Sequence, residues 1–408
     1  MAIVDQELVD EDDPFERFNR AMGMGRVVDA YSDISEERTQ HLVPFRVEGP
    51  ADGQGDDALR ALSFEAVDEI LRDNQRFSSS AYSEVMGDVF GRSILEMDEP
   101  EHRSYRGLLQ QAFTRKALTR WETTLIQPVV DALIDDFEHD ERVDLVRQFA
   151  FPFPLEVIGG FFDLPKSERR RFHRLAIELI SVTVDRDMAI RASTELGNLL
   201  QPLVDERRHH PGDDLISLLA QAEFEGRHLT DAEILSFCRL LAPAGVETTY
   251  RSTSNVLLGL LNNPDQLAAV RADRSLIPQA IEEGLRWECP TPAMVRRATC
   301  DTEVCGVPVR AGTFVIAHVG AANRDPARWD DPDRFDIFRT AKLNLASGTG
   351  AHICLGMHLS RLEVKIALNR LFDRVPERMQ LDPDAEIPLI TGIMFRSPAS
   401  IPVIFDRS

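Results

Sequence analysis

The sequence predicts a single fold that is mainly α-helical with small β-sheets. Apolar residues recur at helical spacing over long stretches, the longest of which is 231–261. No Pro/Gly/Ser-rich linker or internal repeat divides the 408 residues. We therefore expect one α+β domain over 14–408, preceded by a disordered acidic tail over 1–13. The shorter segments expected to be extended are 41–48, 303–318 and 386–405.

The composition is that of an ordinary globular protein, with 43% hydrophobic and 28% charged residues and a net charge of -22. No stretch of about 20 apolar residues is present, and the first residues are acidic rather than basic and apolar. The five cysteines show no framework of paired spacings, which is typical of reduced thiols. We expect a cytoplasmic protein with neither a membrane nor a nucleic acid as partner.

The first candidate motif joins His102 and Arg106, which lie four residues apart in a helical pattern and should share one side of it.

The stretch 103–120 contains basic residues but no Asp or Glu. A solvated helix face is the usual explanation, but on an acidic protein a local basic patch could also attract an acidic partner. The cations of this patch are Arg103, Arg115, Lys116 and Arg120.

A polar segment, 244–249, interrupts the longest apolar helix. A glycine costs about 1 kcal/mol relative to alanine inside a helix, so we expect some group to approach the backbone there. Pro243, directly before the segment, removes one backbone donor and should distort the helix further. The candidate functional residues of the segment are Ala244, Gly245, Glu247 and Thr248.

The helical run 277–287 carries Glu283 and Arg286 three residues apart, which by default is an ordinary ion pair of small energy. Two polar loops follow, at 322–326 and 331–335. By themselves, the ion pair and the two loops do not indicate a function.

That motif is the run 347–356, in which Gly348, Gly350 and Gly356 surround the single thiol of Cys354. Glycines let the backbone approach closely, and apolar periodicity directly after the run predicts a helix. Because a helix N-terminus favours negative charge, the arrangement suits a metal-bound thiolate.

Two alternatives remain open at this cysteine. The first is a buried structural cysteine, which is the usual fate of a lone thiol. The second is zinc bound by His352, Cys354 and His358, although no fourth ligand or CxxC pair supports it.

Together, and in this order, the motifs resemble those of the cytochrome P-450 superfamily in its bacterial form. The run 347–356 is similar to the heme-ligand loop Phe-Gly-x-Gly-x-His-x-Cys-x-Gly, and 244–248 is similar to the oxygen-activation motif Ala-Gly-x-Asp/Glu-Thr. Glu283 and Arg286 match Glu-x-x-Arg, and 102–106 matches His-x-x-x-Arg. The resemblance implies the cytochrome P-450 fold, a single triangular-prism-like domain with a long central helix over heme b.

The resemblance also implies roles. Cys354 would be the axial thiolate of the heme iron, while Thr248 and Glu247 would activate oxygen and deliver protons. A local widening at Ala244 and Gly245, with a kink, would make room for dioxygen. The other implied residues are Glu283, Arg286 and Arg334 as a buried ionic group, and His102, Arg106, Arg296, His352, Gly348, Gly350, Gly356 and Ser347 around the heme.

Two positions depart from the family pattern. Ser347 stands where phenylalanine is usual, and Asn344 stands where many bacterial members have histidine. A hydroxyl at 347 would either donate to the sulfur, which would raise the iron potential, or face solvent.

The implied function is a heme-thiolate monooxygenase that hydroxylates a C–H bond, with O2 as co-substrate and electrons from a separate ferredoxin and ferredoxin reductase. One alternative is a heme-thiolate peroxygenase, isomerase or dehydratase, which the Glu247 and Thr248 pair disfavours. Another is a non-catalytic heme-binding sensor.

By position, the substrate pocket should be largely apolar, so a small neutral hydrophobic substrate is expected. Arg92 and Arg396 lie near these segments and could bind a carboxylate, but a surface role is the more common fate of an arginine. The pocket residues are Val85, Phe90, Ile94, Leu241, Val246, Ala293, Met294, Val295, Ile393 and Met394.

Overall fold

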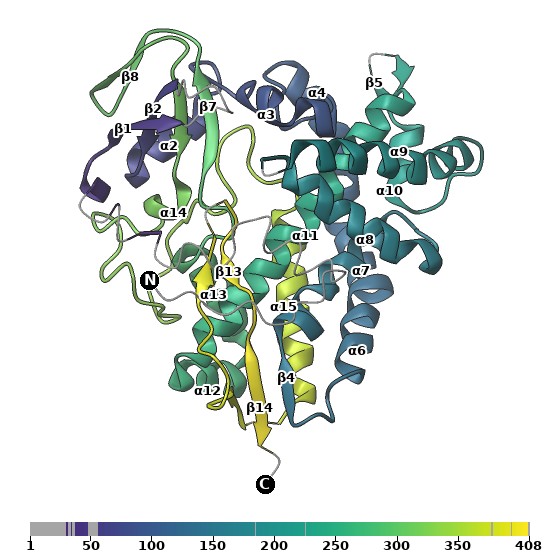
Figure 1. Cartoon of the computed structure of the whole chain (residues 1–408), viewed down its shortest axis with the longest axis vertical. Helices are drawn as coiled ribbons and strands as arrows, with labels where there is room; N and C mark the ends of the chain where they lie inside the picture. Colours follow the sequence, from purple (N-terminus) through teal and green to yellow (C-terminus); the bar gives the residue numbers. More distant parts are fainter. Residues whose placement is uncertain are drawn as a thin grey trace.

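The computed structural model describes residues 30–31, 34, 37–47, 56–183, 185–224, 226–376, 378–392 and 394–406. It confirms a mainly α-helical fold with small separate sheets (Figure 1). The acidic tail 1–13 lies outside the described residues. The α-helices are α2 (Phe64–Arg72), α3 (Ala81–Phe90), α4 (Glu101–Gln110), α5 (Arg115–Trp121), α6 (Gln127–Asp135), α7 (Pro152–Phe161), α8 (Lys166–Ile180), α9 (Arg186–His209), α10 (Leu215–Gln221), α11 (Asp231–Leu261), α12 (Pro264–Ala272), α13 (Ile277–Trp287), α14 (Val319–Ala322) and α15 (Met357–Arg374).

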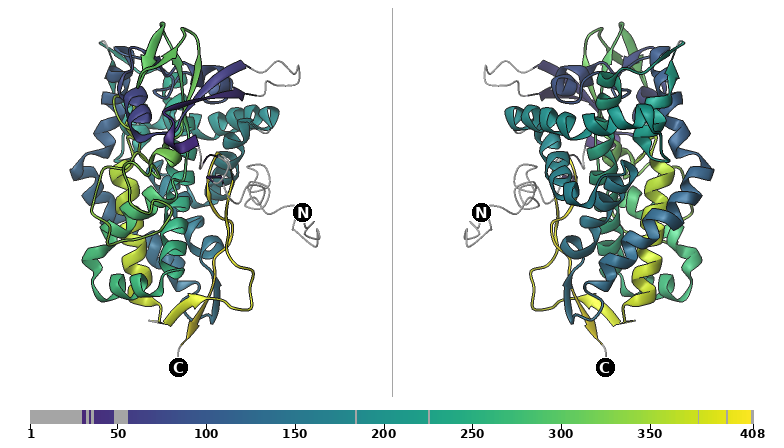
Figure 2. Two further views of the ribbon diagram at one scale, coloured as in Figure 1. Left: turned by 90° about the vertical axis from the view of Figure 1, so that its left-hand side faces the viewer. Right: turned by 90° about the vertical axis from the view of Figure 1, so that its right-hand side faces the viewer.

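The largest sheet has five strands in the order β1-β2-β10-β7-β3, and β10 pairs with β2 in parallel while its other pairs are antiparallel. A three-stranded sheet, β11-β14-β4, lies at the opposite end of the molecule (Figures 1 and 2). The strands are β1 (Leu42–Val47), β2 (Asp56–Ala61), β3 (Phe77–Ser78), β4 (Arg142–Asp144), β5 (Glu223–Phe224), β6 (Arg227–His228), β7 (Met294–Ala298), β8 (Thr302–Val304), β9 (Val307–Val309), β10 (Phe314–Ala317), β11 (Arg378–Leu381), β12 (Ile390–Thr391), β13 (Ser397–Pro398) and β14 (Pro402–Asp406).

The central helix α11 begins at a capping box. The Thr230 hydroxyl accepts the backbone N–H of Glu233 at 3.3 Å, and the Glu233 carboxylate accepts the backbone N–H of Thr230 at 2.7 Å. These two bonds satisfy donors that a helix start would otherwise leave unpaired. The helix then runs without a π or 3-10 turn to Leu261, so the widening expected at Ala244 is not found within these residues.

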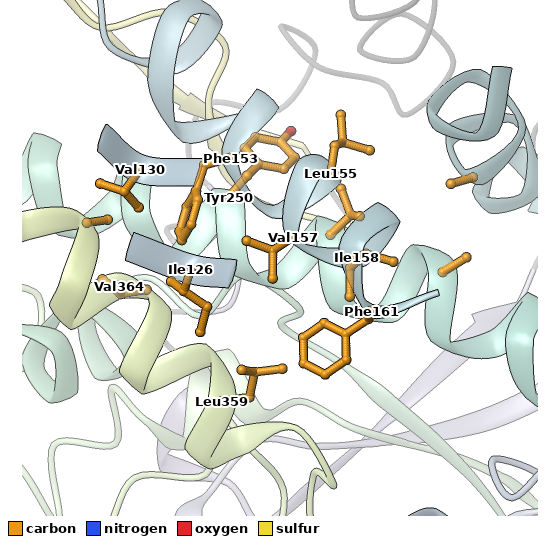
Figure 3. Packing of buried hydrophobic residues seen from close by; sticks show 14 of the residues in the cluster. Ile126, Val130, Phe153, Leu155, Val157, Ile158, Phe161, Tyr250, Leu359 and Val364 are labelled. Carbon is orange, nitrogen blue, oxygen red and sulfur yellow. The ribbon is translucent and has the colours of Figure 1, made fainter. Parts of the chain in front are cut away.

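The main core lies where α6, α7, α11 and α15 meet. Apolar side chains from the four helices interdigitate there, and Val130 of α6, Val157 of α7 and Val364 of α15 represent three of them (Figure 3). Most of α11 is buried, and most of its residues are accordingly apolar or small, while the buried charges of Glu247 and Arg251 pair with each other. This packing fixes α11 and α15 as the two walls of the candidate site.

No described helix is both long enough and apolar enough to cross a membrane. The expected extended segments contain β1, β8 to β10 and β12 to β14. The strands β2 and β7 were not predicted, and β7 is the strand that positions Met294 and Arg296.

Candidate functional site

Cys354 lies in a loop directly before α15, and its thiol opens onto an internal cavity of about 220 Å³. The backbone N–H of Cys354 donates to the carbonyl of Ser347 at 2.8 Å, which closes the loop. Gly348 and Gly350 have φ of 68° and 74°, the left-handed region that favours glycine. A Cβ at Gly350 would overlap the carbonyl oxygen of Leu71, so α2 packs directly against this loop.

Opposing effects act on the sulfur. Cys354 is exposed on its cavity side, but the protein packed around it still desolvates the thiol and raises its pKa, and the backbone N–H of Gly356 is the strongest influence in the other direction. The cations Arg361 and Arg106 also lower it. Because burial dominates, the thiol is neutral by itself, and a bound metal cation would be needed to hold it as a thiolate. Gly356 contributes its N–H rather than unusual backbone freedom, since its φ is -86°.

Zinc at this cysteine finds no support in the structure. His358 is exposed, and Cys354 does not converge with both nearby histidines into a set of ligand atoms within the described chain.

Four predicted donors meet beside the cysteine loop. The rings of His102 and His352 lie 4.0 Å apart between centroids, and Arg106 donates to the carbonyl of Ile353 at 2.6 Å. Arg296 is 3% exposed and comes from β7. Its guanidinium donates to the carbonyl of its neighbour Val295 at 2.7 Å.

Among the described residues, Glu99 is the one carboxylate in hydrogen-bond contact with this cluster, and it contacts only His102. Burial lowers the pKa of Arg106 and Arg296, and burial together with the other three cations lowers the pKa of His352 to about 3. Burial also lowers the pKa of His102, whose Nδ1 lies 3.2 Å from Glu99. The Nε2 atoms of both histidines are buried without a hydrogen-bond partner. Such a set of donors fits the two carboxylates of a heme, because bound anions would remove each of these penalties.

The helix α11 forms one wall of the cavity through Ala244, Gly245 and Thr248. The Thr248 hydroxyl donates to the carbonyl of Ala244 at 3.2 Å. A Cβ at Gly245 would overlap the side chain of Ile158 on α7, and Figure 3 shows Ile158 where α7 packs against α11. The group that approaches this glycine is therefore a side chain from a neighbouring helix.

Glu247 is turned away from the cavity. Its carboxylate accepts hydrogen bonds from Arg251 at 3.0 and 2.9 Å, and both side chains are almost fully buried. Burial raises the pKa of Glu247 to about 7, against the opposing charge of Arg251. One oxygen, Oε1, has no hydrogen-bond partner.

A second buried carboxyl, Glu363, lines the cavity and was not predicted. Thr249 Oγ1 lies 3.3 Å from Glu363 Oε2 and 3.2 Å from Ser360 Oγ. Burial raises the pKa of Glu363 to about 8. The sequence did hold a signal, because Glu363 falls four residues after Leu359 and three before Ile366, within the apolar stripe of its helix.

The cavity wall is mostly apolar, and two predicted pocket residues, Ile94 and Leu241, belong to it. Several lining residues that were not predicted come from α7 and α10, two helices that the sequence analysis did not associate with the site. The further apolar lining residues are Leu95, Phe113, Ile158, Phe161, Phe162, Leu215, Leu240, Leu355 and Leu359.

The remaining pocket residues do not line this cavity. Phe90 and Val246 are buried in the main core, and Met294 packs against Gly348 instead. Met394 is 42% exposed, and Ile393 lies outside the described residues. Val85, Ala293 and Val295 are half-buried elsewhere.

The two arginines near the expected pocket differ from each other. Arg92 is exposed and pairs with Glu101. Arg396, for which a surface role was the expectation, is 1% exposed and donates to Glu288 at 2.8 Å. Since its charge is already neutralised by a buried carboxylate, Arg396 is not available to a substrate carboxylate.

Glu283 and Arg286 form a buried pair, with Nε to Oε2 at 2.7 Å. Arg286 also donates to the carbonyl oxygens of Asn323 at 3.1 Å and Arg334 at 3.0 Å. The Arg334 side chain is exposed, and the third charged member is Arg339, 3.4 Å from Glu283. Arg334 takes part only through its backbone because its side chain points out of the loop.

Ser347 and Asn344 belong to one polar cluster. Arg361 donates to the Ser347 hydroxyl at 3.0 Å and pairs with Glu282 at 2.5 Å. Asn344 donates to the same carboxylate at 3.0 Å. The hydroxyl at 347 therefore accepts from a cation, an arrangement that neither sequence-based alternative contained.

The proposed basic patch is exposed but unevenly neutralised. Arg103 pairs with Glu99 at 3.3 Å and Arg120 pairs with Asp213 at 3.2 Å. Arg115 and Lys116, at the start of α5, have no acidic partner among the described residues.

Comparisons with known proteins give a consistent result. The family model for cytochrome P-450 matches residues 161–397. The biotin biosynthesis cytochrome P-450 of Bacillus subtilis is 36% identical over 337 residues, which cover 81% of this chain and 84% of the relative. The monooxygenase PikC of Streptomyces venezuelae is 32% identical over 376 residues, 89% of this chain and 90% of the relative.

Among solved structures, CYP109E1 from Bacillus megaterium in complex with testosterone superimposes with a TM-score of 0.81 at 30% identity. The match covers 93% of this chain and 99% of that chain. It therefore extends well beyond the segment matched by the family model.

Proposed function

Because this chain belongs to the cytochrome P-450 family, whose members are heme-iron monooxygenases, we propose that it inserts one oxygen atom from O2 into a C–H bond of a small hydrophobic substrate. The observation that carries the proposal is the convergence of the Cys354 thiol with His102, Arg106 and His352 on a single, mostly apolar cavity, with the Arg296 charge close to His352. The cofactor would be heme b, bound through Cys354 and through its two carboxylates.

The bound heme would supply oxygen activation, with the thiolate donating electron density to the iron. His102, Arg106, Arg296 and His352 would hold the carboxylates and fix its orientation. The Cys354 loop would be kept in place by its bond to Ser347 and by the packing of Gly350 against α2.

Proton supply is assigned to the hydroxyl and carboxyl groups of α11 and α15. Thr248 would present its hydroxyl to the cavity after giving up its bond to the Ala244 carbonyl. Glu363 would hold a proton at its carboxyl and pass it through Thr249. Glu247, on the side of α11 that faces away from the cavity, would be a second proton donor, since its raised pKa also keeps a proton on the carboxyl near neutral pH.

The apolar lining favours a neutral, hydrophobic substrate, because burial of an unpaired charge among these side chains would be costly. The testosterone complex of the similar CYP109E1 is compatible with a substrate of this kind. Arg396 offers no alternative anchor for a carboxylate, since Glu288 occupies it.

Electrons would come from a ferredoxin and its separate reductase, and Arg115 and Lys116 would attract the acidic ferredoxin. We also propose a cytoplasmic location. All five cysteines are free, which suits a reducing compartment.

The test is the absorbance spectrum of the purified protein, reduced under carbon monoxide. Thiolate ligation of a heme shifts the Soret band of the reduced carbon monoxide complex strongly to the red, so we expect that band in the wild type and its loss in Cys354→Ala. The matched control is Cys300→Ala, which removes an exposed thiol and should leave the band in place. An unshifted wild-type band would contradict thiolate ligation, and absence of heme would contradict the cofactor assignment.

A further inference from the structure

A second group of ligand-type side chains lies outside the cavity, where β1, α2 and the β8–β9 turn meet. His41 directly precedes β1, Glu65 lies in the first turn of α2, and Cys305 forms the turn between β8 and β9. One ligand atom from each of the three lies within 4.8 Å of the other two. Figure 1 shows β1, α2 and β8 gathered at the same end of the molecule.

The His41 ring is already oriented by a neighbour. Its Nδ1 lies 2.8 Å from the Ser63 hydroxyl, which also accepts the backbone N–H of Ala66 at 3.2 Å as the N-cap of α2. With Nδ1–H donating to Ser63, the lone pair of the ring is on Nε2. A metal-binding histidine typically donates its other ring N–H to an oxygen in this way.

Cys305 occupies an unusual place for a cysteine. Its φ of 48° lies in the left-handed region, and Gly306 after it has a φ of 79°. Hairpin turns of this kind are normally built from Gly, Asn or Asp, because other side chains carry a steric cost there. The Cys305 backbone N–H donates to Glu69 Oε2 at 3.2 Å, which anchors the turn to α2.

The charges around the thiol are predominantly negative. Burial and the carboxylates of Glu65 and Glu69 raise the pKa of Cys305 to about 11. Glu69 is partly neutralised by Arg76 at 2.9 Å, whereas Glu65 has no cation paired with it among the described residues. A cation placed between the three ligand atoms would turn this repulsion into attraction.

We propose that His41, Glu65 and Cys305 bind one zinc ion. Sulfur, imidazole nitrogen and carboxylate oxygen are the ligands that Zn²⁺ accepts together, whereas Mg²⁺ and Ca²⁺ take oxygen only. The thiol proton leaves to solvent as the Zn–S bond forms, so no oxidant or reductant is required. Three protein ligands leave the fourth tetrahedral position to water.

The consequence of binding is structural. The ion would join a strand, a helix start and a hairpin turn. Here His41 contacts Ser63 through one hydrogen bond, and Cys305 contacts Glu69 through its backbone N–H at 3.2 Å and its thiol at 3.6 Å. The thiol would give up its bond to Glu69 when it binds the ion. A ligand that binds only the folded state stabilises it by mass action.

The test is equilibrium dialysis of the heme-loaded, tag-free protein against ZnCl2 after chelator treatment, with bound metal quantified. We expect saturable binding of one zinc per chain, with affinity reduced by about tenfold or more in Cys305→Ser and in His41→Ala. Cys300→Ser, five residues away on the same hairpin segment and exposed, should bind as the wild type does. Wild-type affinity in Cys305→Ser, or no saturable binding in the wild type, would overturn the site.

A second readout separates zinc binding from misfolding of a variant. In the wild type, zinc should slow alkylation of Cys305 by iodoacetamide, resolved by tandem mass spectrometry, while alkylation of Cys300 stays unchanged. Equal effects on the two thiols, or no protection of Cys305, would mean that the metal binds elsewhere. Neither result depends on catalytic activity, so the zinc site and the monooxygenase proposal can fail separately.

Discussion

A hydrogen bond of 3.3 Å joins Thr249 Oγ1 to Glu363 Oε2, where α11 packs against α15. The second carboxyl oxygen of Glu363 is buried without a partner. The pair places an acid that is protonated at neutral pH on the wall of the cavity, on the helix that follows the cysteine loop. This acid also leaves a signature in the stability of the protein.

Glu363→Gln should stabilise the protein at alkaline pH. An ordinary glutamate titrates near 4.5 and the folded-state pKa here is about 8, so between these values the unfolded chain loses its proton while the folded chain keeps it. Stability therefore falls as pH rises through this window, and glutamine removes the fall. We expect a gain on the order of 5 kcal/mol above the folded pKa and little change below about pH 5.

Urea unfolding of the cofactor-free protein at several pH values measures this difference. Glu223→Gln, on the exposed strand β5, is the matched control and should follow the wild type at every pH. Parallel pH profiles for wild type and Glu363→Gln would show that the carboxyl is not titrating as described.

Thr248→Ala should uncouple electron consumption from product formation. Two hydroxyls of the segment 244–249 line the cavity, those of Thr248 and Thr249, and the proposal assigns proton supply at the cavity to the Thr248 hydroxyl. A methyl group at position 248 would leave that task to water. We expect the product formed per reductant consumed to fall roughly fivefold or more. Thr253→Ala is the control, since its hydroxyl is buried against the Thr249 carbonyl at 2.9 Å. Unchanged coupling in Thr248→Ala would remove the threonine from the proton path.

Arg361→Gln should lower the iron potential by on the order of tens of millivolts. Arg361 favours negative charge on the Cys354 sulfur, so its loss leaves the sulfur a stronger electron donor. Ser347→Ala should produce a smaller change in the same direction, because Glu282 still holds the guanidinium. Spectroelectrochemical titration measures both, with Arg370→Gln on the same helix as control. A potential that matches wild type in Arg361→Gln would mean that this cluster does not reach the sulfur.

The double variant Arg115→Gln/Lys116→Gln should weaken the salt dependence of electron transfer from a ferredoxin. These two cations have no acidic partner among the described residues, so their field is free to attract an acidic protein. We expect a rate reduced several-fold at low ionic strength and nearly equal to wild type at high salt. Arg103→Gln removes a cation already paired with Glu99 and should have a smaller effect. If the rate of electron transfer depended on salt identically in the wild type and the double variant, the ferredoxin would bind at another surface.

The local motifs could be read from the sequence because each is short and its spacing fixes its geometry. Glu283 and Arg286, three apart on one helix, and His102 and Arg106, four apart, lie where the helical repeat requires. The cysteine loop was predictable because Gly348 and Gly350 take positive φ, which few other residues tolerate.

Residues that meet through tertiary packing were less accessible. Ile158 and Phe161 reach the cavity because α7 packs against α11. The spacing of residues within either helix does not predict that the two helices pack together. Arg339, and not the predicted Arg334, pairs with Glu283, because the path of an irregular loop decides which side chain turns inward. Phe90 and Val246 were predicted to line the pocket but lie in the main core. An apolar side chain near a site packs as favourably in the core as in a cavity wall, so the sequence does not distinguish the two places.

The close approach of Gly350 to the Leu71 carbonyl means that the loop carrying Cys354, the proposed iron ligand, is positioned in part by the C-terminal turn of α2. Substitutions in that turn should act as remote adjustments of the Cys354 sulfur, even though they touch neither cofactor nor substrate. A search for variants with altered reactivity would therefore gain by sampling α2 together with the cavity wall.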